Sequence, residues 1–540
     1  MAHDPLTLGG VLERQAAERP DFVVVTVEGA GVRPDETRSY RQLWQRGQAL
    51  AAGLQARGMQ RGDRLGTMLA NHAEWVDLMV ACSLLGVVLV PIDPRTRGDK
   101  LVFMLDSVHC QAVVVADYAW AELAKVRDRL PGLRWTAVLP TDEAPALKLP
   151  EHAQDIFLLD ALATDATSAE LTGCAPDDAL ELIFTSGTTG DPKGIVMTHR
   201  RYVGTAMSLP QVFGFTTDER LYSGLSLTHA NAQLITLGTA LVHALPCVLS
   251  RRFSKSRLWD ITRQHGCTSF TLLGGMTTAI YAEPPQFNDG EHPVRHIISA
   301  GMPAAIWPNF ERRFNVQLLE FYGAAEGGLT VNPPGVGPVG SIGKPVPTLQ
   351  HRIVDEEGAD VQPDASGNRV GELLFRHHDG SPFVVTYDGN PQASASKCAG
   401  GWLRMGDVVR EDADGWLYFM FRQGGGIRRN GDFIDPAYIE KVIAEDPSVD
   451  DVYVYGIPAK NGGVGEKDVV AAVVAKSGMS PGFDVQALFA LCRRQLEANF
   501  IPRFIQVLDA IPKTASEKPQ DRFLIESLNR HPESVFTEVR

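Results

Sequence analysis

Short apolar segments alternate with helix-like segments through the larger part of the chain, and this alternation most strongly limits the possible fold. Residues 40–57 repeat apolar positions at helical spacing and end at Gly58, which predicts a helix. The sequence then reads as a strand (DRLGTMLAN), a helix (EWVDLMVACSLLG) and a second strand (VVLVPIDP). The segments CQAVVVAD, RWTAVLP and VRHIISAG have the same strand-like character. Apolar strands joined by helices predict parallel sheets with crossover helices, and therefore an α/β fold.

The pattern changes past about residue 415, where the strand-like segment GWLYFMFRQ is followed by the glycines at 424–426. Beyond them, AYIEKVIAE and DVQALFALCRRQLEA read as helices, and DVYVYGIP and DVVAAVVA as strands. This mixture is typical of a compact α+β domain. Because glycine accepts backbone angles that other residues avoid, the glycine run is a natural boundary. We therefore predict a large N-terminal domain, residues 1–424, and a small C-terminal domain, residues 425–540.

Composition excludes several classes of function. The 540 residues carry a formal charge of −14 and no block of lysine and arginine, which argues against a nucleic-acid binder. The 7 cysteines lie far apart, without the spacing of a zinc site or a disulfide framework, which suits a reducing cytoplasm. The N-terminus lacks the pattern of a signal peptide. The most apolar run, residues 78–92, is shorter than the ~20 residues that span a bilayer, so we expect a cytoplasmic protein without a membrane span.

The most informative segment is ELIFTSGTTGDPKGIVMTH, residues 181–199. A strand-like stretch enters a loop rich in Ser, Thr and Gly, passes Lys193, and returns as a second strand-like stretch. Glycines let the backbone approach a bulky anion, hydroxyls donate hydrogen bonds to it, and a lysine adds a positive charge. The loop is not a Walker A motif, because Pro192 precedes Lys193 and Gly194 follows it. It predicts a binding site for phosphate groups.

Five segments resemble, in the expected order, the signature of the adenylate-forming superfamily of acyl-CoA ligases, peptide-synthetase adenylation domains and luciferases. They are the phosphate loop, FYGAAEG (321–327), GWLRMGDV (401–408), FRQGGGIRRNGDFIDP (421–436) and IPKTASEKPQ (511–520). The segments LTHANAQ and IRRNGD are most similar to the crotonobetaine/carnitine-CoA ligase-like branch. The resemblance implies a large α/β N-terminal domain of parallel-rich sheets with flanking helices and a β-barrel-like part. It also implies a small, mobile α+β C-terminal domain.

The resemblance further implies an ATP-dependent acid–CoA ligase. A carboxylate and ATP would give an acyl-adenylate and pyrophosphate, and coenzyme A would then accept the acyl group. The partners would be a small-molecule carboxylic acid, ATP, Mg²⁺ and coenzyme A, and a homodimer would be compatible with the family. Matching the motifs residue by residue implies ATP- and AMP-binding roles for Thr185, Ser186, Gly187, Thr188, Thr189, Lys193, Tyr322, Asp407 and Arg422.

Other positions match the family's catalytic and acyl-binding residues. Glu326 would help to ligate Mg²⁺, and Lys518 would reach the α-phosphate during adenylation. His229 would gate the acyl pocket, although a core histidine is an equal alternative. Gly425 lies at the family's hinge, and Gly431 lies where the pantetheine arm of coenzyme A passes. The remaining pocket residues implied by the resemblance are Thr228, Asn231, Gly274, Gly301, Met302 and Gly323.

Four positions depart from the family's pattern: Ala325, Met405, Gly425 and Glu517. None of them removes a charged residue that the resemblance assigns to chemistry. The polar segment LTHANAQ favours a small or medium carboxylic acid over a long fatty acid, and no aspartate near residue 229 would hold an amino-acid ammonium group. Two alternatives stay open: an adenylating enzyme that passes the acyl group to an amine or a carrier-protein thiol, and a degenerate acyl or nucleotide sensor without activity.

Overall fold

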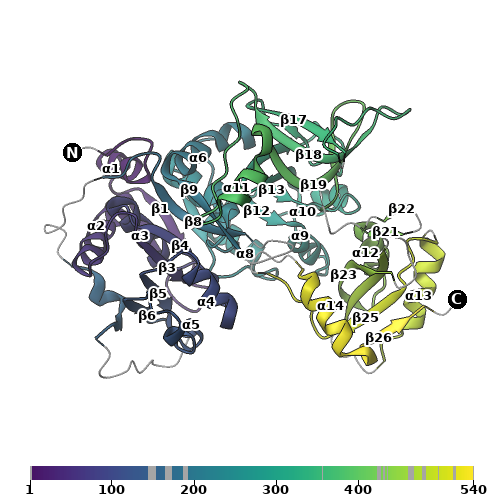
Figure 1. Cartoon of the computed structure of the whole chain (residues 1–540), viewed down its shortest axis with the longest axis horizontal. Coiled ribbons are helices and arrows are strands. Elements are labelled where there is room, and N and C mark those ends of the chain that lie inside the picture. The colour runs from purple at the N-terminus through teal and green to yellow at the C-terminus, as the bar shows by residue number, and fades with distance from the viewer. Residues whose placement is uncertain are drawn as a thin grey trace.

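The computed structural model describes residues 3–143, 154–164, 173–185, 192–355, 357–422, 427–429, 432–434, 436–459, 467–476, 482–496, 498–514 and 519–538. Two large sheets and a smaller antiparallel sheet form the large body, and the C-terminal elements, olive green to yellow in Figure 1, lie beside it. The predicted α/β fold is confirmed. The predicted boundary between residues 424 and 425 lies outside the described residues and stays a prediction.

The first large sheet contains seven strands. In spatial order they are β7 (Ile156–Leu158), β6 (Trp135–Leu139), β5 (Ala112–Ala116), β3 (Arg64–Met68), β4 (Val88–Pro91), β8 (Ala179–Thr185) and β9 (Lys193–Thr198). All neighbours are parallel except β8 and β9, which form an antiparallel pair at the edge. The strands predicted from CQAVVVAD, RWTAVLP and VVLVPIDP are β5, β6 and β4. The phosphate loop therefore joins the last two strands of this sheet.

The second large sheet contains nine strands. In spatial order they are β16 (Lys344–Pro345), β15 (Gly327–Asn332), β14 (Gln317–Ala324), β13 (His296–Ala300), β12 (Ser269–Leu273), β10 (Leu221–Ser223), β11 (Cys247–Leu249), β1 (Val23–Val27) and β2 (Glu36–Ser39). The central strands are parallel, and the ends β15, β16 and β2 are antiparallel. Strand β14 is the last strand of the parallel part, because it is parallel to β13 and antiparallel to β15.

The third sheet is antiparallel and has the order β17 (Leu349–Val354), β18 (Arg369–His377), β19 (Leu403–Glu411) and β20 (Leu417–Arg422). The sequence resemblance implies a β-barrel-like part here. Among the described strands this part is an open sheet and not a closed barrel, because β17 and β20 are its two edges and do not pair with each other.

The helices of the large body cover the sheets (Figure 1). They are α1 (Leu8–Glu18), α2 (Tyr40–Ala56), α3 (Ala73–Leu85), α4 (Gly98–Asp106), α5 (Asp117–Ala124), α6 (His199–Phe213), α7 (Thr239–His243), α8 (Leu258–His265), α9 (Gly274–Tyr281), α10 (Trp307–Phe314) and α11 (Pro391–Lys397). Ser39 caps α2 by a reciprocal capping box with Gln42, which explains why the predicted helix begins there.

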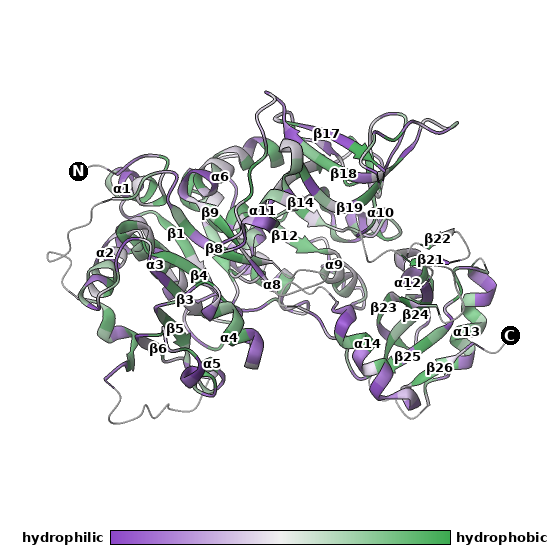
Figure 2. Cartoon of the chain, viewed as in Figure 1, coloured by the Kyte–Doolittle hydropathy of each residue, from purple (hydrophilic) through white to green (hydrophobic). Residues whose placement is uncertain are grey.

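The apolar run at residues 78–92 is buried throughout, as α3 followed by β4. Helix α3 is apolar on all sides because it lies inside the main hydrophobic core, which includes Trp75, Tyr40 and strand residues of both large sheets. Strand β5, which consists of alanine and valine, is hydrophobic along its length in Figure 2. Among the described helices, none has the length and apolar character required to cross a membrane.

The C-terminal unit has its own hydrophobic core. Its elements are β21 (Ile427–Arg429), β22 (Asp432–Ile434), α12 (Pro436–Ala444), β23 (Val449–Pro458), β24 (Lys467–Ala475), α13 (Val485–Gln495), β25 (Phe504–Leu508), α14 (Asp521–Arg530) and β26 (Val535–Thr537). Strands β23 to β26 form one mixed sheet, and β21 pairs with β22. The α+β character predicted for this part of the chain is confirmed.

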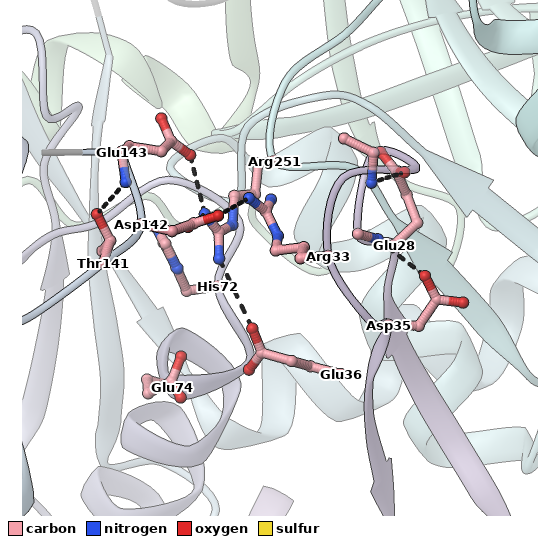
Figure 3. Close-up of polar contacts among 12 residues, drawn as sticks. Glu28, Arg33, Asp35, Glu36, His72, Glu74, Thr141, Asp142, Glu143 and Arg251 are labelled. Atoms are coloured by element: carbon pink, nitrogen blue, oxygen red, sulfur yellow. Dashed lines mark hydrogen bonds and ion pairs between the residues drawn. The ribbon is translucent and has the colours of Figure 1, made fainter.

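A network of ion pairs joins the two large sheets (Figure 3). Arg251, which follows β11, lies 2.7 Å from an Asp142 oxygen and 3.0 Å from a Glu143 oxygen, both of which follow β6. Arg33, in the loop before β2, lies 2.7 Å from the other Asp142 oxygen. The two guanidinium groups lower the pKa of Asp142. The network therefore connects loops of both sheets through a shared pair of carboxylates.

We expect Arg251→Met to lower the free energy of unfolding by about 2 kcal/mol, because two carboxylates lose a charged hydrogen-bond donor. The matched control is Arg252→Met. Arg252 also pairs with Glu143, but 74% of its side chain is exposed, against 9% for Arg251. Arg252→Met should lower the free energy of unfolding by less than about 1 kcal/mol. Urea denaturation of both variants measures the difference, and equal losses would contradict a structural role for the network.

A buried carboxyl in β8 generates a prediction about pH. Burial raises the pKa of Glu181 to about 8, although the Gln233 side chain opposes this shift. The unfolded carboxyl has the ordinary value of 4.5, so between these values the folded state holds a proton that the unfolded state has lost. The stability that Glu181 contributes is complete below about pH 4.5 and decreases toward pH 8, by at most about 1.4 kcal/mol per pH unit.

We expect Glu181→Gln to flatten the dependence of unfolding free energy on pH across this window, because the amide does not titrate. Glu18→Gln, at an exposed position of α1, is the control and should leave the slope unchanged. Urea denaturation at several pH values measures both slopes. A slope in Glu181→Gln identical to that of the unsubstituted protein would show that the carboxyl is ionised when folded.

Candidate active site

The strands on both sides of the phosphate loop form a regular hairpin. Thr185, the last residue of β8, pairs with Lys193, the first residue of β9. This pairing holds the two ends of the loop together. The Lys193 ammonium group lies 5.5 Å from the centre of the Tyr387 ring. The predicted loop residues Ser186, Gly187, Thr188 and Thr189 lie outside the described residues.

Three predicted nucleotide-binding residues come together at the junction of the nine-stranded sheet and the antiparallel sheet. The Tyr322 hydroxyl, at the end of β14, donates a hydrogen bond to an Asp407 carboxylate oxygen on β19. Asp407 pairs in register with Arg422 on β20, whose Nε lies 3.8 Å from the other carboxylate oxygen. Asp407 is 6% exposed. Burial and then the Asp407 charge raise the pKa of Tyr322 well above its ordinary value, so the hydroxyl stays a donor.

Glu326 lies in the turn between β14 and β15 and is buried. The Tyr387 hydroxyl donates a 2.8 Å hydrogen bond to its Oε1. Tyr387 itself forms a bridge with Ile195 of β9, so it belongs to the edge of the seven-stranded sheet. Arg201, on α6, donates to the carbonyl oxygen of Ala325 beside Glu326. The three sheets therefore meet at the carboxylates of Glu326 and Asp407.

This arrangement is compatible with a Mg²⁺ ion that is bound together with phosphate groups. Among the described residues there is no group of three or more metal-ligating side chains. Mg²⁺ bound to a nucleotide needs only one or two protein carboxylates, because phosphate oxygens and water supply the other ligands. Tyr387 holds one oxygen of Glu326, Oε1, and among the described residues the hydrogen bonds of Glu326 leave its Oε2 available for a cation. The donor set therefore fits the predicted metal.

The predicted gate and two pocket residues follow β10. Thr228 Oγ1 lies 2.9 Å from Ser226 Oγ, and His229 donates its backbone N–H to the Ser226 carbonyl oxygen. Asn231 begins a π-helical segment, Asn231–Gly238. Such i→i+5 turns are rare and occur frequently at functional sites.

Two buried amides hold the segment before this π-helical turn. Asn71 donates to the carbonyl oxygens of Leu225 and Ser250 and accepts from the N–H of Leu227. Gln233 donates to the carbonyl oxygen of Leu227. The turn that carries the predicted gate is therefore held from both sides by side chains that the sequence analysis did not single out.

A second group of predicted pocket residues forms a close backbone contact. A Cβ atom on Gly274, at the start of α9, would lie 2.4 Å from the carbonyl oxygen of Gly301, so only glycine fits. The buried Glu320 on β14 accepts the backbone N–H groups of Gly301 and Met302. Burial raises the pKa of Glu320 to about 8. Gly323, three residues along β14, is limited in a similar way, since its Cβ would lie 2.7 Å from the Gly328 carbonyl oxygen.

Strand β14 thus connects the two groups: Glu320 supports the Gly301 turn, and Tyr322 contacts Asp407. Lys518, Gly425 and Gly431 lie outside the described residues, as does Glu517. Sequence reasoning missed Tyr387, Glu320 and Arg201. A glutamate inside an otherwise apolar strand, directly before FYGAAEG, was the available signal for Glu320, whereas no motif marks Tyr387 or Arg201.

Two family models match the chain: "AMP-binding enzyme" over residues 12–381 and "AMP-binding enzyme C-terminal domain" over residues 438–518. A medium/long-chain-fatty-acid–CoA ligase of Mycobacterium marinum is 29% identical over 88% of this chain and 89% of the relative. The long-chain fatty acid transport protein 1 of Homo sapiens is 28% identical, over 95% and 81%.

Solved structures share the fold. A crystal structure of an anthranilate CoA ligase with anthranoyl-AMP has a TM-score of 0.82 at 22% identity and covers 99% of both chains. The o-succinylbenzoate coenzyme A synthetase from Bacillus subtilis, with ATP and magnesium ion, has a TM-score of 0.76 at 23% identity, over 95% of this chain and 99% of the other. The first family model alone spans more than half of the residues, so this chain belongs to the AMP-binding enzyme family.

Proposed function

We propose that this protein is an ATP-dependent acid–CoA ligase. A carboxylate oxygen attacks the α-phosphorus of ATP, and the bond to pyrophosphate breaks, which gives an acyl-adenylate. The sulfur of coenzyme A then attacks the acyl carbonyl carbon, the bond to the phosphate oxygen of AMP breaks, and the thiol proton passes to solvent. Family membership supports the nucleotide chemistry, and curated relatives that are named as acid–CoA ligases support the overall reaction.

One observation carries the proposal for the site. Tyr322 and Glu326 come from one motif, Asp407 and Arg422 come from two others, and the side chains of all four meet at one junction. We assign the ribose hydroxyls to Asp407, because a carboxylate can accept two hydrogen bonds. Tyr322 would contact the adenine, and Arg422 would contact ribose or phosphate oxygens. The loop ends at Thr185 and Lys193 would face the β- and γ-phosphates.

Glu326 would hold Mg²⁺ with the phosphate oxygens, and Tyr387 would orient its carboxylate through the hydrogen bond to Oε1. The ion supplies positive charge to the phosphates when bound. This charge matters because the reaction brings a carboxylate to a polyphosphate. Two like unit charges 4 Å apart repel by about 4 kcal/mol at an effective dielectric constant near 20. The protein must therefore provide oriented cations and donors at the reacting phosphorus.

The acyl group would occupy the space bounded by Thr228, His229 and Asn231 on one side. The contact between Gly274 and Gly301, with Met302 and Gly323, would bound the other side. The backbone contact fixes the shape of this second wall, because a larger residue at Gly274 cannot be accommodated. The segment LTHANAQ predicts a small or medium acid, whereas the names of two relatives refer to medium- or long-chain fatty acids. The acids to test therefore include longer chains. A cytoplasmic location, a homodimer, the hinge at Gly425, the pantetheine contact at Gly431 and the catalytic role of Lys518 stay predictions.

The deciding experiment is ATP–pyrophosphate exchange across a panel of aromatic, short, medium and long-chain carboxylic acids. We expect exchange that depends on the acid and on Mg²⁺, and release of AMP and an acyl-CoA product when coenzyme A is added. Mass spectrometry identifies the product, and parallel reactions with amines and hydroxylamine identify other acceptors. Exchange without any CoA product would favour another acceptor. The absence of exchange with every acid would favour a sensor without activity.

Two isosteric variants test the assignment of the carboxylates. We expect Asp407→Asn to weaken the binding of both adenosine and AMP by about 10- to 100-fold, because ribose loses a charged acceptor. Glu326→Gln should leave AMP binding without Mg²⁺ unchanged and raise the Mg²⁺ concentration needed for half-maximal exchange by about tenfold or more.

Calorimetry and a Mg²⁺ titration of the exchange rate measure the two effects. Asp414→Asn, at an exposed position in the turn before β20, is the control and should change neither quantity. If Asp407→Asn left the affinity for adenosine unchanged, the assignment of the ribose hydroxyls to Asp407 would be wrong. If Glu326→Gln left the required Mg²⁺ concentration unchanged, Glu326 would not be the metal ligand.

A further inference from the structure

Lys397 is a lysine at the active-site junction to which the sequence motifs assign no role. It is the last residue of α11, and its Nζ donates to the carbonyl oxygen of Met405 on β19 at 3.4 Å. Its side chain is half-buried. Glu326 and Asp407 both act electrostatically on its ammonium group, as does Arg422. Lys397 is therefore close to both carboxylates at which the three sheets meet.

The ammonium group of Lys397 lacks a compensating ion pair within the part of the chain that the structure describes. Glu326 receives its hydrogen bond from Tyr387, and Asp407 is contacted by Tyr322 and Arg422. Burial lowers the pKa of Lys397, and the two carboxylates only partly oppose this shift. A partly desolvated cation that is hydrogen-bonded to a carbonyl oxygen, and not to a carboxylate, is stabilised when an anion binds to it.

The neighbouring residues offer few other donors. Ala325 has no polar side chain, and Met405 has only a thioether, which is a weak acceptor. Arg201 uses its guanidinium group to donate to the Ala325 carbonyl oxygen. The Lys193 ammonium group lies 5.5 Å from the centre of the Tyr387 ring, whose hydroxyl is hydrogen-bonded to Glu326. The Lys397 ammonium group lies beside Met405, two residues before Asp407, and the charges of both carboxylates act on it.

We propose that Lys397 binds the α-phosphate of the nucleotide. The inference rests on the proposed function, in which Asp407 holds the ribose and Glu326 holds Mg²⁺ with the distal phosphates. The α-phosphate connects these two parts of ATP, so it must lie between the two carboxylates. Lys397 is a cation on which both carboxylates act. Its ammonium group would neutralise the oxygens around the phosphorus that the substrate carboxylate attacks, and it would hold AMP by the same oxygens.

With Lys397 in this role, the large body itself supplies a cation at the reacting phosphorus. Lys397 belongs to α11, which packs against β19, and not to the C-terminal unit that contains Lys518. The α-phosphate would therefore be bound before and after any movement of the C-terminal unit. The binding of AMP, which lacks the distal phosphates, is the direct measure of this contact.

The test compares AMP with adenosine, which differ only in the α-phosphate, by isothermal titration calorimetry of the full-length protein. We expect Lys397→Met to weaken AMP binding by about 10- to 100-fold, as for the loss of one hydrogen bond to a charged group. Adenosine affinity should change by less than about twofold. Lys397→Arg keeps the charge, so it should retain AMP affinity to within about tenfold.

The matched control is Lys344→Met in the same large body. Lys344 also donates to a carbonyl oxygen, that of Asp414, and its ammonium group lies 4.6 Å from the centre of the Trp416 ring. This variant should change neither affinity. Equal losses of AMP and adenosine affinity in Lys397→Met would indicate a packing role and overturn the proposal, and so would an unchanged AMP affinity.

The calorimetry needs no acid, no Mg²⁺ and no coenzyme A, so its result is separate from that of the exchange assay. Selective loss of AMP affinity without acid-dependent exchange would refute the ligase and leave the phosphate contact standing. Exchange in the unsubstituted protein with no effect of Lys397→Met on AMP would refute the phosphate contact alone. An unsubstituted protein that binds AMP no more tightly than adenosine would also overturn the proposal, because no cation would then bind the phosphate.

Discussion

Two hydrogen bonds from tyrosine hydroxyls to buried carboxylates hold the active site together. Tyr322 connects the nine-stranded sheet to Asp407 on the antiparallel sheet, and Tyr387 connects the edge of the seven-stranded sheet to Glu326. A buried carboxylate without such a partner would carry a large desolvation cost. The chemistry of the site therefore depends on the relative position of three sheets, and each sheet supplies either a carboxylate or the donor that holds one.

Two other buried carboxyls of the large body, Glu181 and Glu320, differ from Glu326 and Asp407 in that neither accepts a hydrogen bond from a tyrosine among the described contacts. Burial raises the pKa of Glu181 and of Glu320 to about 8. Glu320 receives two backbone N–H groups from the turn at Gly301, which it holds in place beside Gly274. Glu320 therefore stabilises the shape of a turn beside the site. The position of Glu181 and Glu320 inside otherwise apolar strands separates them from the carboxylates at the junction of the sheets.

The sequence allowed the α/β class, the helix at α2 and the buried pair of α3 and β4 to be predicted, because apolar periodicity is a local property. The approach of Tyr322, Asp407 and Arg422 could be expected only through the family motifs, since the residues are far apart in the chain. Tyr387, Arg201 and Lys397 were not found because no local pattern marks a side chain that becomes important through contacts across sheets. The open edges of the β17–β20 sheet likewise depend on strand pairing, which residue patterns alone do not determine.

The bridge between Ile195 and Tyr387 has a consequence for ligand binding. Ile195 lies two residues beyond Lys193, which is the first residue of β9 after the phosphate loop. Its bridge partner, Tyr387, donates a hydrogen bond from its hydroxyl to Glu326. A shift of the loop end on contact with phosphate would move the group that orients the metal-binding carboxylate. Any free energy that passes through this connection acts equally in both directions. The protein would then bind metal more tightly in the presence of nucleotide, and nucleotide more tightly in the presence of metal, by the same factor.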